Sequence, residues 1–491
     1  MLLEMEVGAF GERVAYGDSI GGLTFAELFE RAAKMASALR SSGAARLTYV
    51  DLSTLHLPVA LYASSWANTP FVPLSYRLAD DRLAELVARQ SPAVVICGED
   101  FVGRVGLPNE SSVYTTSAYA ESTQANAPAA SDWSYDPDDI GVLLHTSGTS
   151  GEPKVAVLRQ KHLVSYVLGS VEFMGAQEDE AALVSVPPYH IAGVAALITN
   201  GYAGRRVLQL PNFDPGEWVR VVREQHITHA MVVPTMLSRI IEVLADGKGL
   251  PTLRNLSYGG GRMPLPVIER TLELLPHVNF VNAYGLTETS SSIAILGPED
   301  HRDAIKSDLH EVRARLGSVG RPLPTVEISI RDDAGAEVAV GVSGEVWVRG
   351  DQVSGEYGSK SMLNADGWFA TNDGGHFDAE GFLFVEGRID DVIVRGGENL
   401  SPGEIEDVLL THPGVRECAV FGVPDTEWGE VVAAVVVAHQ HEIPSADDLR
   451  AWVTKRLRSS RAPVVVEFRT ELPYNDTGKV LRRVLKAELS S

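Results

Sequence analysis

The stretch from His145 to Lys154, HTSGTSGEPK, is the strongest single indication of what this chain is. It follows a short apolar run, Gly141 to Leu144, that is typical of a buried strand. Glycines let a backbone turn tightly, so the N–H groups and hydroxyls of such a loop can surround phosphate oxygens. A Walker A loop is excluded, because Lys154 here follows Pro153 and precedes Val155 instead of preceding Ser or Thr. The stretch by itself predicts a phosphate-binding loop or a polar turn.

Further motifs follow along the chain, and they remove that ambiguity. They are PPYHIAG at 187–193, NAYGLTET at 282–289, GEVWVRG at 344–350, TND at 371–373, GRIDDVIVRGGENLSPGEIE at 387–406 and NDTGK at 475–479. In this order and approximate spacing they resemble the adenylate-forming superfamily of acyl-CoA synthetases, peptide-synthetase adenylation domains and beetle luciferases. The resemblance extends from about residue 10 to Lys486.

Composition sets the broad class of the protein. A chain of 491 residues is too long for one core, and 45% hydrophobic with 22% charged residues is ordinary for a globular protein. No apolar run approaches the roughly 20 residues of a membrane span, and no secretory signal is visible, so we expect a cytoplasmic protein. The net charge of −23 argues against nucleic acid as a partner. Cys97 and Cys418 stand in apolar, strand-like segments and are expected to be buried, reduced thiols.

The order of predicted elements indicates an α/β fold. Strands and helices alternate up to about residue 284, which predicts mostly parallel sheets covered by helices, with a surface linker at 121–138. Short strands and Gly/Asp turns predict a β-rich part at about 317–386, and the last hundred residues a small α+β unit with helices at 402–410, 446–457 and 479–489. We therefore expect a large domain at 1–387, a hinge at 388–391 and a mobile small domain at 392–491. The resemblance assigns the hinge itself to Asp390.

Activation of a carboxylate by ATP brings together groups that repel each other, so the site must supply cations and fixed donors. Glu288 is the predicted Mg²⁺ ligand, since one carboxylate plus phosphate oxygens suits this hard ion. The resemblance implies that Thr287 contacts the α-phosphate. It also implies a phosphate-binding set made of Thr146, Ser147, Gly148, Thr149, Ser150, Gly151 and Lys154.

Nucleoside recognition needs a flat partner and polar groups. Tyr284 can stack on adenine and the Asn282 amide can pair with its exocyclic amine. Asp373 and Arg388 resemble the ribose-binding pair of the family, although Asn372 stands where the family usually has glycine. The remaining predicted nucleotide-binding residues are Gly259, Gly260, Gly261, Ala283 and Gly285.

Lys479 in NDTGK is the predicted adenylation lysine, whose ammonium would bridge the substrate carboxylate and the α-phosphate. It lies on the small domain, so the position of that domain decides whether it reaches the site. The resemblance implies that the small domain rotates after adenylation and that Gly396 and Gly397 then line the approach of the CoA thiol.

The acid is only loosely indicated. Peptide-synthetase adenylation domains hold the substrate amino group with an aspartate in the segment where this chain has His190, so a plain carboxylic acid is favoured; a packing histidine remains the alternative. A medium-chain fatty, aromatic or alicyclic acid would enter an apolar pocket predicted from His190, Val233, Met236, Tyr258, Gly259 and Ala283. CoA is the favoured acceptor of the acyl group, and an acyl carrier protein is the alternative acceptor. A remote alternative is that the protein binds nucleotide without catalysis. The sequence leaves open whether the protein forms a homodimer.

Overall fold

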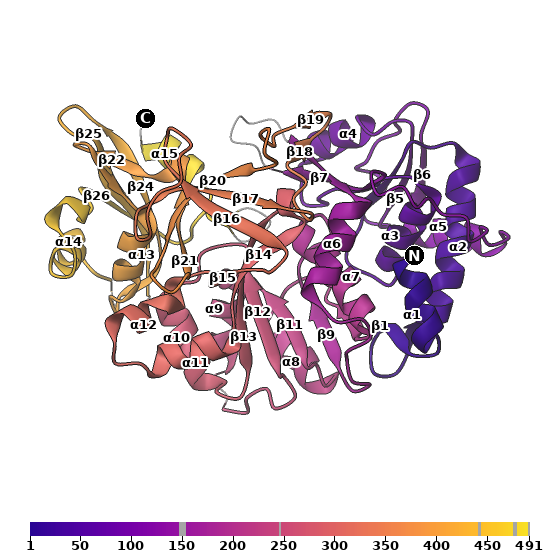
Figure 1. Ribbon diagram of the computed structural model, residues 1–491, viewed down its shortest axis with the longest axis horizontal. Coiled ribbons are helices and arrows are strands. Elements are labelled where there is room, and N and C mark those ends of the chain that lie inside the picture. Colours follow the sequence, from indigo (N-terminus) through magenta and orange to yellow (C-terminus); the bar gives the residue numbers. More distant parts are fainter. Residues whose placement is uncertain (147–153, 245–246, 440–442, 475–478, 490–491) are drawn as a thin grey trace.

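The structure, a computed structural model, describes residues 1–146, 154–244, 247–439, 443–474 and 479–489. It contains a large N-terminal domain built on three sheets and a small C-terminal domain built on a fourth (Figure 1). The predicted fold class, helix-covered parallel sheets with a β-rich part and a C-terminal α+β domain, is confirmed.

The central sheet of the large domain has the strand order β15-β14-β13-β12-β11-β9-β10-β1-β2. Its strands from β13 to β1 run parallel, as the alternating βα pattern predicts. The bounds are β1 (Val14–Gly17), β2 (Gly22–Thr24), β9 (Ala181–Val184), β10 (Arg206–Gln209), β11 (His229–Val232), β12 (Asn255–Gly259), β13 (Asn279–Leu286), β14 (Ser291–Leu296) and β15 (Arg321–Pro322).

A second sheet carries the segment with which the sequence analysis began. Its order is β19-β18-β8-β7-β4-β3-β5-β6, and residues 147–153 connect two antiparallel strands, β7 and β8. The bounds are β3 (Arg46–Val50), β4 (Phe71–Pro73), β5 (Ala93–Cys97), β6 (Ser112–Thr115), β7 (Ile140–Thr146), β8 (Lys154–Arg159), β18 (Glu356–Tyr357) and β19 (Lys360–Ser361).

The two remaining sheets are mostly antiparallel. In the large domain β16 (Val326–Arg331), β17 (Gly344–Gly350), β20 (Phe369–Phe377) and β21 (Leu383–Arg388) pair in that order. The small domain is built on β22 (Ile393–Arg395), β23 (Glu398–Leu400), β24 (Val415–Asp425), β25 (Gly429–Ala438) and β26 (Val465–Arg469). A short helical turn at Ile389–Asp391 joins β21 to β22, at the predicted hinge.

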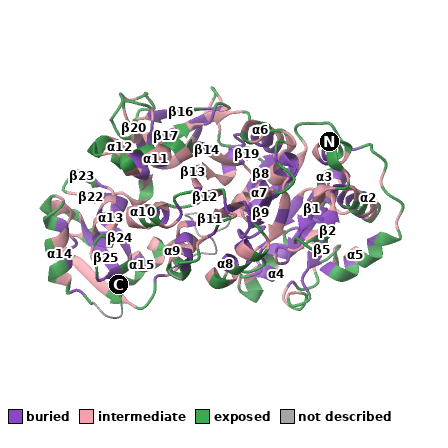
Figure 2. Cartoon of the chain, turned by 90° about the horizontal axis from the view of Figure 1, so that it is seen from below, coloured by how far each residue is buried: buried purple, intermediate pink, exposed green. Residues whose placement is uncertain are grey.

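Helices cover these sheets, and buried residues gather along the strands and the inward helix faces (Figure 2). A capping box made by Thr24 and Glu27 begins α2. The helices are α1 (Leu2–Phe10), α2 (Phe25–Ser42), α3 (His56–Ala67), α4 (Asp80–Ala88), α5 (Thr116–Gln124), α6 (Gln160–Ser170), α7 (Ile191–Ala203), α8 (Pro215–Glu224), α9 (Pro234–Val243), α10 (Leu265–Leu274), α11 (Pro298–Lys306), α12 (His310–Ala314), α13 (Pro402–Leu410), α14 (Ala446–Thr454) and α15 (Arg482–Leu489).

Two predictions on local structure need correction. The linker predicted at 121–138 begins inside α5, whose cap is the Thr115 hydroxyl, and it is anchored by Trp133, which packs edge-on against Trp66. The helix predicted at 479–489 begins only at Arg482, because Val480 forms a β-bridge with Tyr474. Both cysteines are buried in strands as expected, and burial raises the pKa of the Cys97 thiol to about 11.

Candidate active site

The predicted site residues converge at the carboxyl ends of the parallel strands in the central sheet. His190 follows β9 and caps α7, Val233 follows β11, and Thr287 follows β13. The glycine triplet begins with the last residue of β12. Crevices at the carboxyl ends of strands are where open α/β sheets bind ligands. The fold therefore brings residues about a hundred positions apart in the sequence to one edge.

A hydrogen-bonded cluster surrounds the predicted ribose ligand. The Tyr284 hydroxyl donates to Oδ2 of Asp373 over 2.6 Å, and the Arg388 guanidinium lies 3.1 Å from its Oδ1. Arg388 also donates to the carbonyl of Thr371, whose hydroxyl accepts from the Asp373 N–H. Burial and the Asp373 carboxylate raise the pKa of Tyr284 far above its ordinary value, so its hydroxyl stays a donor. The carboxylate is thus held in one orientation.

In the glycine triplet of the predicted nucleotide site, the neighbouring backbone leaves no space for a side chain at Gly259. A Cβ on Gly259 would lie 2.2 Å from the Ala283 carbonyl, since these two residues are register partners on neighbouring strands. The Asn282 amide nitrogen donates to the Ser318 carbonyl over 3.0 Å. This bond leaves the amide oxygen of Asn282 as the atom that can accept from an exocyclic amine.

Asn372 adopts the left-handed conformation that a glycine would adopt. Its φ is 62°, a region that asparagine tolerates better than most side chains. Its N–H donates to Glu345, and its side chain donates to Asp390 of the predicted hinge over 3.0 Å. The departure from the family motif therefore keeps the turn and adds a contact to the hinge.

The predicted magnesium ligand, Glu288, is buried and its carboxylate accepts a hydrogen bond from the Tyr357 hydroxyl. Lys154 lies over the ring of the same tyrosine, 5.3 Å from its centroid. Tyr357 comes from β18, which pairs with β8 directly beside Lys154. Sequence reasoning missed Tyr357, because only this pairing of distant strands places it between the phosphate-binding segment and Glu288.

The donor set suits a magnesium ion that keeps several waters or phosphate oxygens. Glu288 supplies one carboxylate, and within the described residues no group of three His, Cys, Asp or Glu side chains could form a dedicated metal cage. When bound, Mg²⁺ would neutralise phosphate charge. Of the predicted phosphate-binding set, Ser147, Gly148, Thr149, Ser150 and Gly151 lie outside the described residues. Thr146 and Lys154 pair in register where β7 and β8 meet.

Lys479 of the small domain lies near the ribose cluster of the large domain. The residue as a whole is exposed, yet partial burial of its ammonium group lowers its pKa, and the charge of Arg388 lowers it further. Asp373 and Asp391 act on this pKa in the opposite direction. The lysine predicted to perform adenylation is therefore within electrostatic reach of the predicted nucleotide-binding residues.

The predicted acyl pocket is only partly supported by the geometry. The His190 ring packs against Tyr189, with 4.6 Å between centroids, and Val233 approaches the glycine triplet at Gly260. Met236 is half-buried and packs on the core beneath. Tyr258 was predicted as a lining residue, but its side chain is fully buried and its hydroxyl pairs with His301 over 2.8 Å. Tyr258 therefore belongs to the core.

Gly396 and Gly397 form the turn between β22 and β23 in the small domain. Both have positive φ, and a Cβ on Gly396 would lie 2.9 Å from the Trp428 ring. Glycine is therefore required at position 396 by both backbone and packing.

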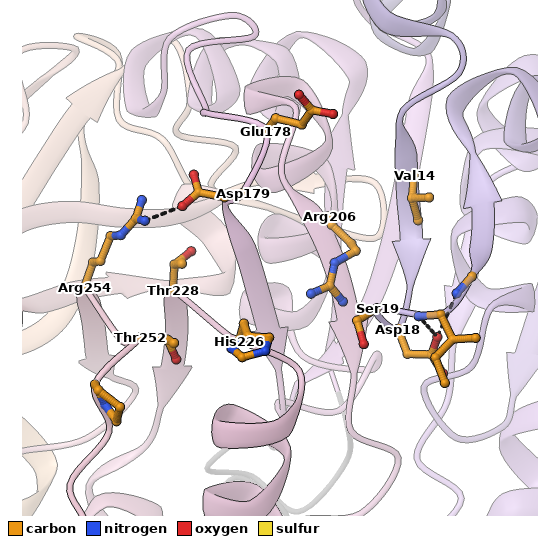
Figure 3. A pocket seen from close by; sticks show the side chains of 13 residues that line it. Val14, Asp18, Ser19, Glu178, Asp179, Arg206, His226, Thr228, Thr252 and Arg254 are labelled. Carbon is orange, nitrogen blue, oxygen red and sulfur yellow. Dashed lines mark hydrogen bonds and ion pairs between the residues drawn. The ribbon is translucent and has the colours of Figure 1, made fainter.

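A cavity of about 660 Å³ lies at the opposite, amino-terminal edge of the central sheet (Figure 3). Of its charged groups, Arg254 pairs with Asp179, and Arg206 donates to the carbonyls of Gly17 and Gln225. We do not assign it a part in the site, because the motif residues lie at the other edge.

Comparison with known proteins agrees with this geometry. Residues 3–358 match the model of the AMP-binding enzyme family, and residues 404–479 match that of the AMP-binding enzyme C-terminal domain. The chain belongs to the AMP-binding enzyme family. The predicted membership of the adenylate-forming superfamily is thereby confirmed.

Relatives in the family include enzymes with different acceptors. A fatty acid–[acyl-carrier-protein] ligase, ScoC of Streptomyces coeruleorubidus, is 31% identical over 94% of this chain and 91% of its own length. A feruloyl-CoA synthase of an Amycolatopsis species is 32% identical over 94% and 92%. The o-succinylbenzoate CoA synthetase MenE of Bacillus subtilis, solved with its acyl-adenylate, superimposes with a TM-score of 0.85 at 28% identity over 99% and 97%. MenE has also been solved with ATP and magnesium ion.

These relatives confirm the predicted enzyme class, an AMP-forming acid–thiol ligase. Its co-substrates are ATP and CoA, and its metal ion is Mg²⁺. Among the described helices, none is both long and apolar enough to span a membrane.

Proposed function

We propose that this protein converts an aromatic or alicyclic carboxylic acid to its acyl-adenylate with ATP, and then transfers the acyl group to CoA. In the first step a carboxylate oxygen attacks the α-phosphorus and pyrophosphate leaves. In the second step the CoA thiolate attacks the acyl carbon and AMP leaves. The observation that carries the proposal is that Lys479 of the small domain lies within electrostatic reach of Asp373 and Arg388.

Each predicted residue has a distinct part in this proposal. Asp373, held by Tyr284 and Arg388, accepts from the ribose hydroxyls. Lys479 balances charge between the carboxylate and the α-phosphate, as electrostatic stabilisation of a phosphoryl-transfer transition state requires. Thr287 and the described end of the phosphate loop, Lys154, contact the phosphates.

The hinge is proposed at Asp390, between the large domain at 1–387 and the small domain at 392–491. The turn Ile389–Asp391 lies between β21 of one domain and β22 of the other, which suits a hinge made of a few terminal residues. Rotation about it would withdraw Lys479 and bring Gly396 and Gly397 to the thiol's path.

The nature of the acid follows from the proposed pocket. None of its described residues, His190, Val233, Met236, Gly259 and Ala283, is a lysine or arginine that could pair with a second carboxylate. An acid with an uncharged ring, such as ferulate, therefore suits the pocket better than a dicarboxylate. We place the reaction in the cytoplasm, where ATP and CoA are available and the buried thiols stay reduced.

The test is mass spectrometry of products from ATP, Mg²⁺ and a panel of acids with and without CoA. The panel contains ferulate, 2-succinylbenzoate and medium-chain fatty acids. We expect feruloyl-CoA and AMP only in the presence of CoA. Absence of both acyl-AMP and acyl-CoA with every acid would contradict the proposal.

A carrier protein is the second candidate acceptor, because ScoC is a carrier-protein ligase at similar identity. Acyl-AMP that accumulates with CoA present, and disappears on addition of a phosphopantetheinylated carrier protein, would favour that acceptor.

A further inference from the structure

An ion pair joins the predicted adenine-binding segment of the large domain to the small domain. Arg262 directly follows the glycine triplet 259–261, and its guanidinium donates to the carboxylate of Asp407 on α13. The two residues are 145 positions apart in the sequence. The Asp407 side chain is 18% exposed and that of Arg262 is 37% exposed, so the carboxylate is the shielded partner and the guanidinium reaches it from the surface.

Helix α13 is shaped to let this arginine pass. A Cβ built on Gly403 would lie 1.7 Å from Nη1 of Arg262 and 2.8 Å from its Cζ. Gly403 has no unusual backbone angle, so a side chain there would meet only the outer part of the Arg262 side chain, which would have to move from its present position. The absence of a side chain at Gly403 and the Arg262–Asp407 ion pair therefore belong to the same contact between the two domains.

The surroundings of Asp407 make its partner important. The pKa of this carboxyl is raised to about 6, because burial together with the nearby Glu406 and Glu404 outweighs the lowering effect of Arg262. Loss of the partner would leave a buried, ionised group without compensation at higher pH, which is strongly unfavourable. Arg262 therefore compensates the charge of a largely buried carboxylate at the boundary between the domains.

A pocket lies beside the ion pair at the boundary between the domains. A cavity of about 540 Å³ opens between α10 and the small domain, and among its lining residues are Leu265, Pro266, Val408 and Trp452. Asp407 is itself one of the lining residues, so the ion pair lies at the edge of this pocket.

We propose that the Arg262–Asp407 pair is a latch that holds the small domain in the adenylation arrangement, with Lys479 at the nucleotide site. Both are positioning residues. This inference rests on the proposed two-step function, in which the pair forms for adenylation and separates for thioester formation. Because Arg262 extends from the adenine-binding segment, occupation of that segment and closure of the small domain are coupled through one side chain.

The first test separates the two half-reactions in R262A, D407A, the double variant and the control R270A. Arg270 pairs with Glu273 within α10, and both of these side chains are exposed. The rate of acid-dependent ATP–pyrophosphate exchange measures adenylation. The rate of acyl transfer from added feruloyl-adenylate to CoA measures thioester formation. We expect exchange to fall about five- to fiftyfold in either single variant and no further in the double variant. Thioester formation should be unchanged or faster.

The sharpest variant is Gly403→Ala. Alanine in a helix is ordinarily favourable relative to glycine, so a role limited to stability predicts a neutral or stabilising change. The latch predicts instead that G403A slows pyrophosphate exchange like R262A, and that it has no further effect in the R262A background. Equal loss in both half-reactions, or normal exchange in G403A and R262A, would overturn the inference.

A second measurement does not depend on the acid. Spin labels at Glu299→Cys in the large domain and Asp447→Cys in the small domain report the domain distance, since both side chains are exposed and the native cysteines are buried. With MgATP, we expect one narrow distance distribution that R262A broadens. An unchanged distance distribution in R262A would contradict the proposed latch. If no acid supports exchange in the unmodified protein, the proposed function fails while this measurement still decides on the latch.

Discussion

The Asn372 side chain donates a 3.0 Å hydrogen bond to Oδ2 of Asp390, so the turn before the proposed ribose ligand is tied to the proposed hinge. Asn372 also holds a φ of 62°. A glycine at this position would keep the turn but lose the bond. Asparagine therefore combines a backbone role with a side-chain role that the usual family residue lacks.

The variants N372G and N372A separate these roles. Alanine in the left-handed region costs about 1 kcal/mol, so N372A should unfold at lower urea concentration than N372G. Both lose the bond to Asp390, and in both we expect faster thioester formation because the hinge is less restrained. Identical stability of the two variants would show that the turn does not require this conformation.

Replacement of Lys479 by alanine tests its catalytic part. We expect adenylate formation to fall by about two to three orders of magnitude, with ATP binding by calorimetry nearly unchanged. Lys486→Ala is the matched control, because Lys486 lies on the same domain and pairs with Glu430. Normal pyrophosphate exchange in K479A would remove this lysine from the mechanism.

The pH dependence of adenylation follows from the lowered pKa of Lys479. Burial and Arg388 make this ammonium lose its proton at lower pH than an ordinary lysine. Adenylation needs the cation, so its rate should decline as pH rises, with a midpoint below about 10.4. In K479R the residual rate should lose this alkaline decline, because arginine stays protonated. An identical decline in both proteins would assign it to another group.

Tyr357→Phe tests the hydrogen bond to Glu288. Removal of the donor frees the carboxylate to rotate, so we expect the KM for MgATP to rise several-fold with a smaller change in kcat. Tyr357→Leu also removes the ring beneath Lys154 and should raise KM further. Tyr135→Phe, whose parent side chain is exposed, is the control. Unchanged MgATP titrations in both Tyr357 variants would contradict the assignment.

A buried carboxyl far from the site makes stability depend on pH. Glu6 is fully buried, its oxygens have no hydrogen-bond partner among the described residues, and burial raises its pKa from 4.5 to about 8. Between these values the unfolded chain has lost this proton while the folded chain keeps it. Stability should therefore fall by up to about 1.4 kcal/mol per pH unit as pH rises through this window.

Glu6→Gln removes this titration, so the pH dependence of the urea midpoint should become flatter between these values. Glu4→Gln on the same helix, where the parent residue is exposed, should leave the slope as it is. Equal slopes in both variants would place the pH dependence elsewhere.

The site illustrates how far local patterns reach. Lys154, Glu288, Asp373 and Lys479 were predicted from motifs, because each stands in a short segment whose composition is typical of a chemical task. Tyr258 was misplaced, since a residue beside a glycine triplet can face the pocket or the core. The alternation of side chains along β12 decides between these two orientations. The Tyr258 side chain lies on the same face as that of Leu256, in the core under α10 and α11.

The sequence by itself determined the α/β class, the two-domain order and the family, since periodicity and motif spacing are properties of neighbouring residues. Only the tertiary structure decided that Tyr357 contacts Glu288, that Arg262 reaches Asp407 past Gly403, and that Asn372 meets the hinge. Each of these contacts joins segments between 18 and 145 residues apart. No local pattern encodes such pairs, because they depend on how sheets and domains pack together in space.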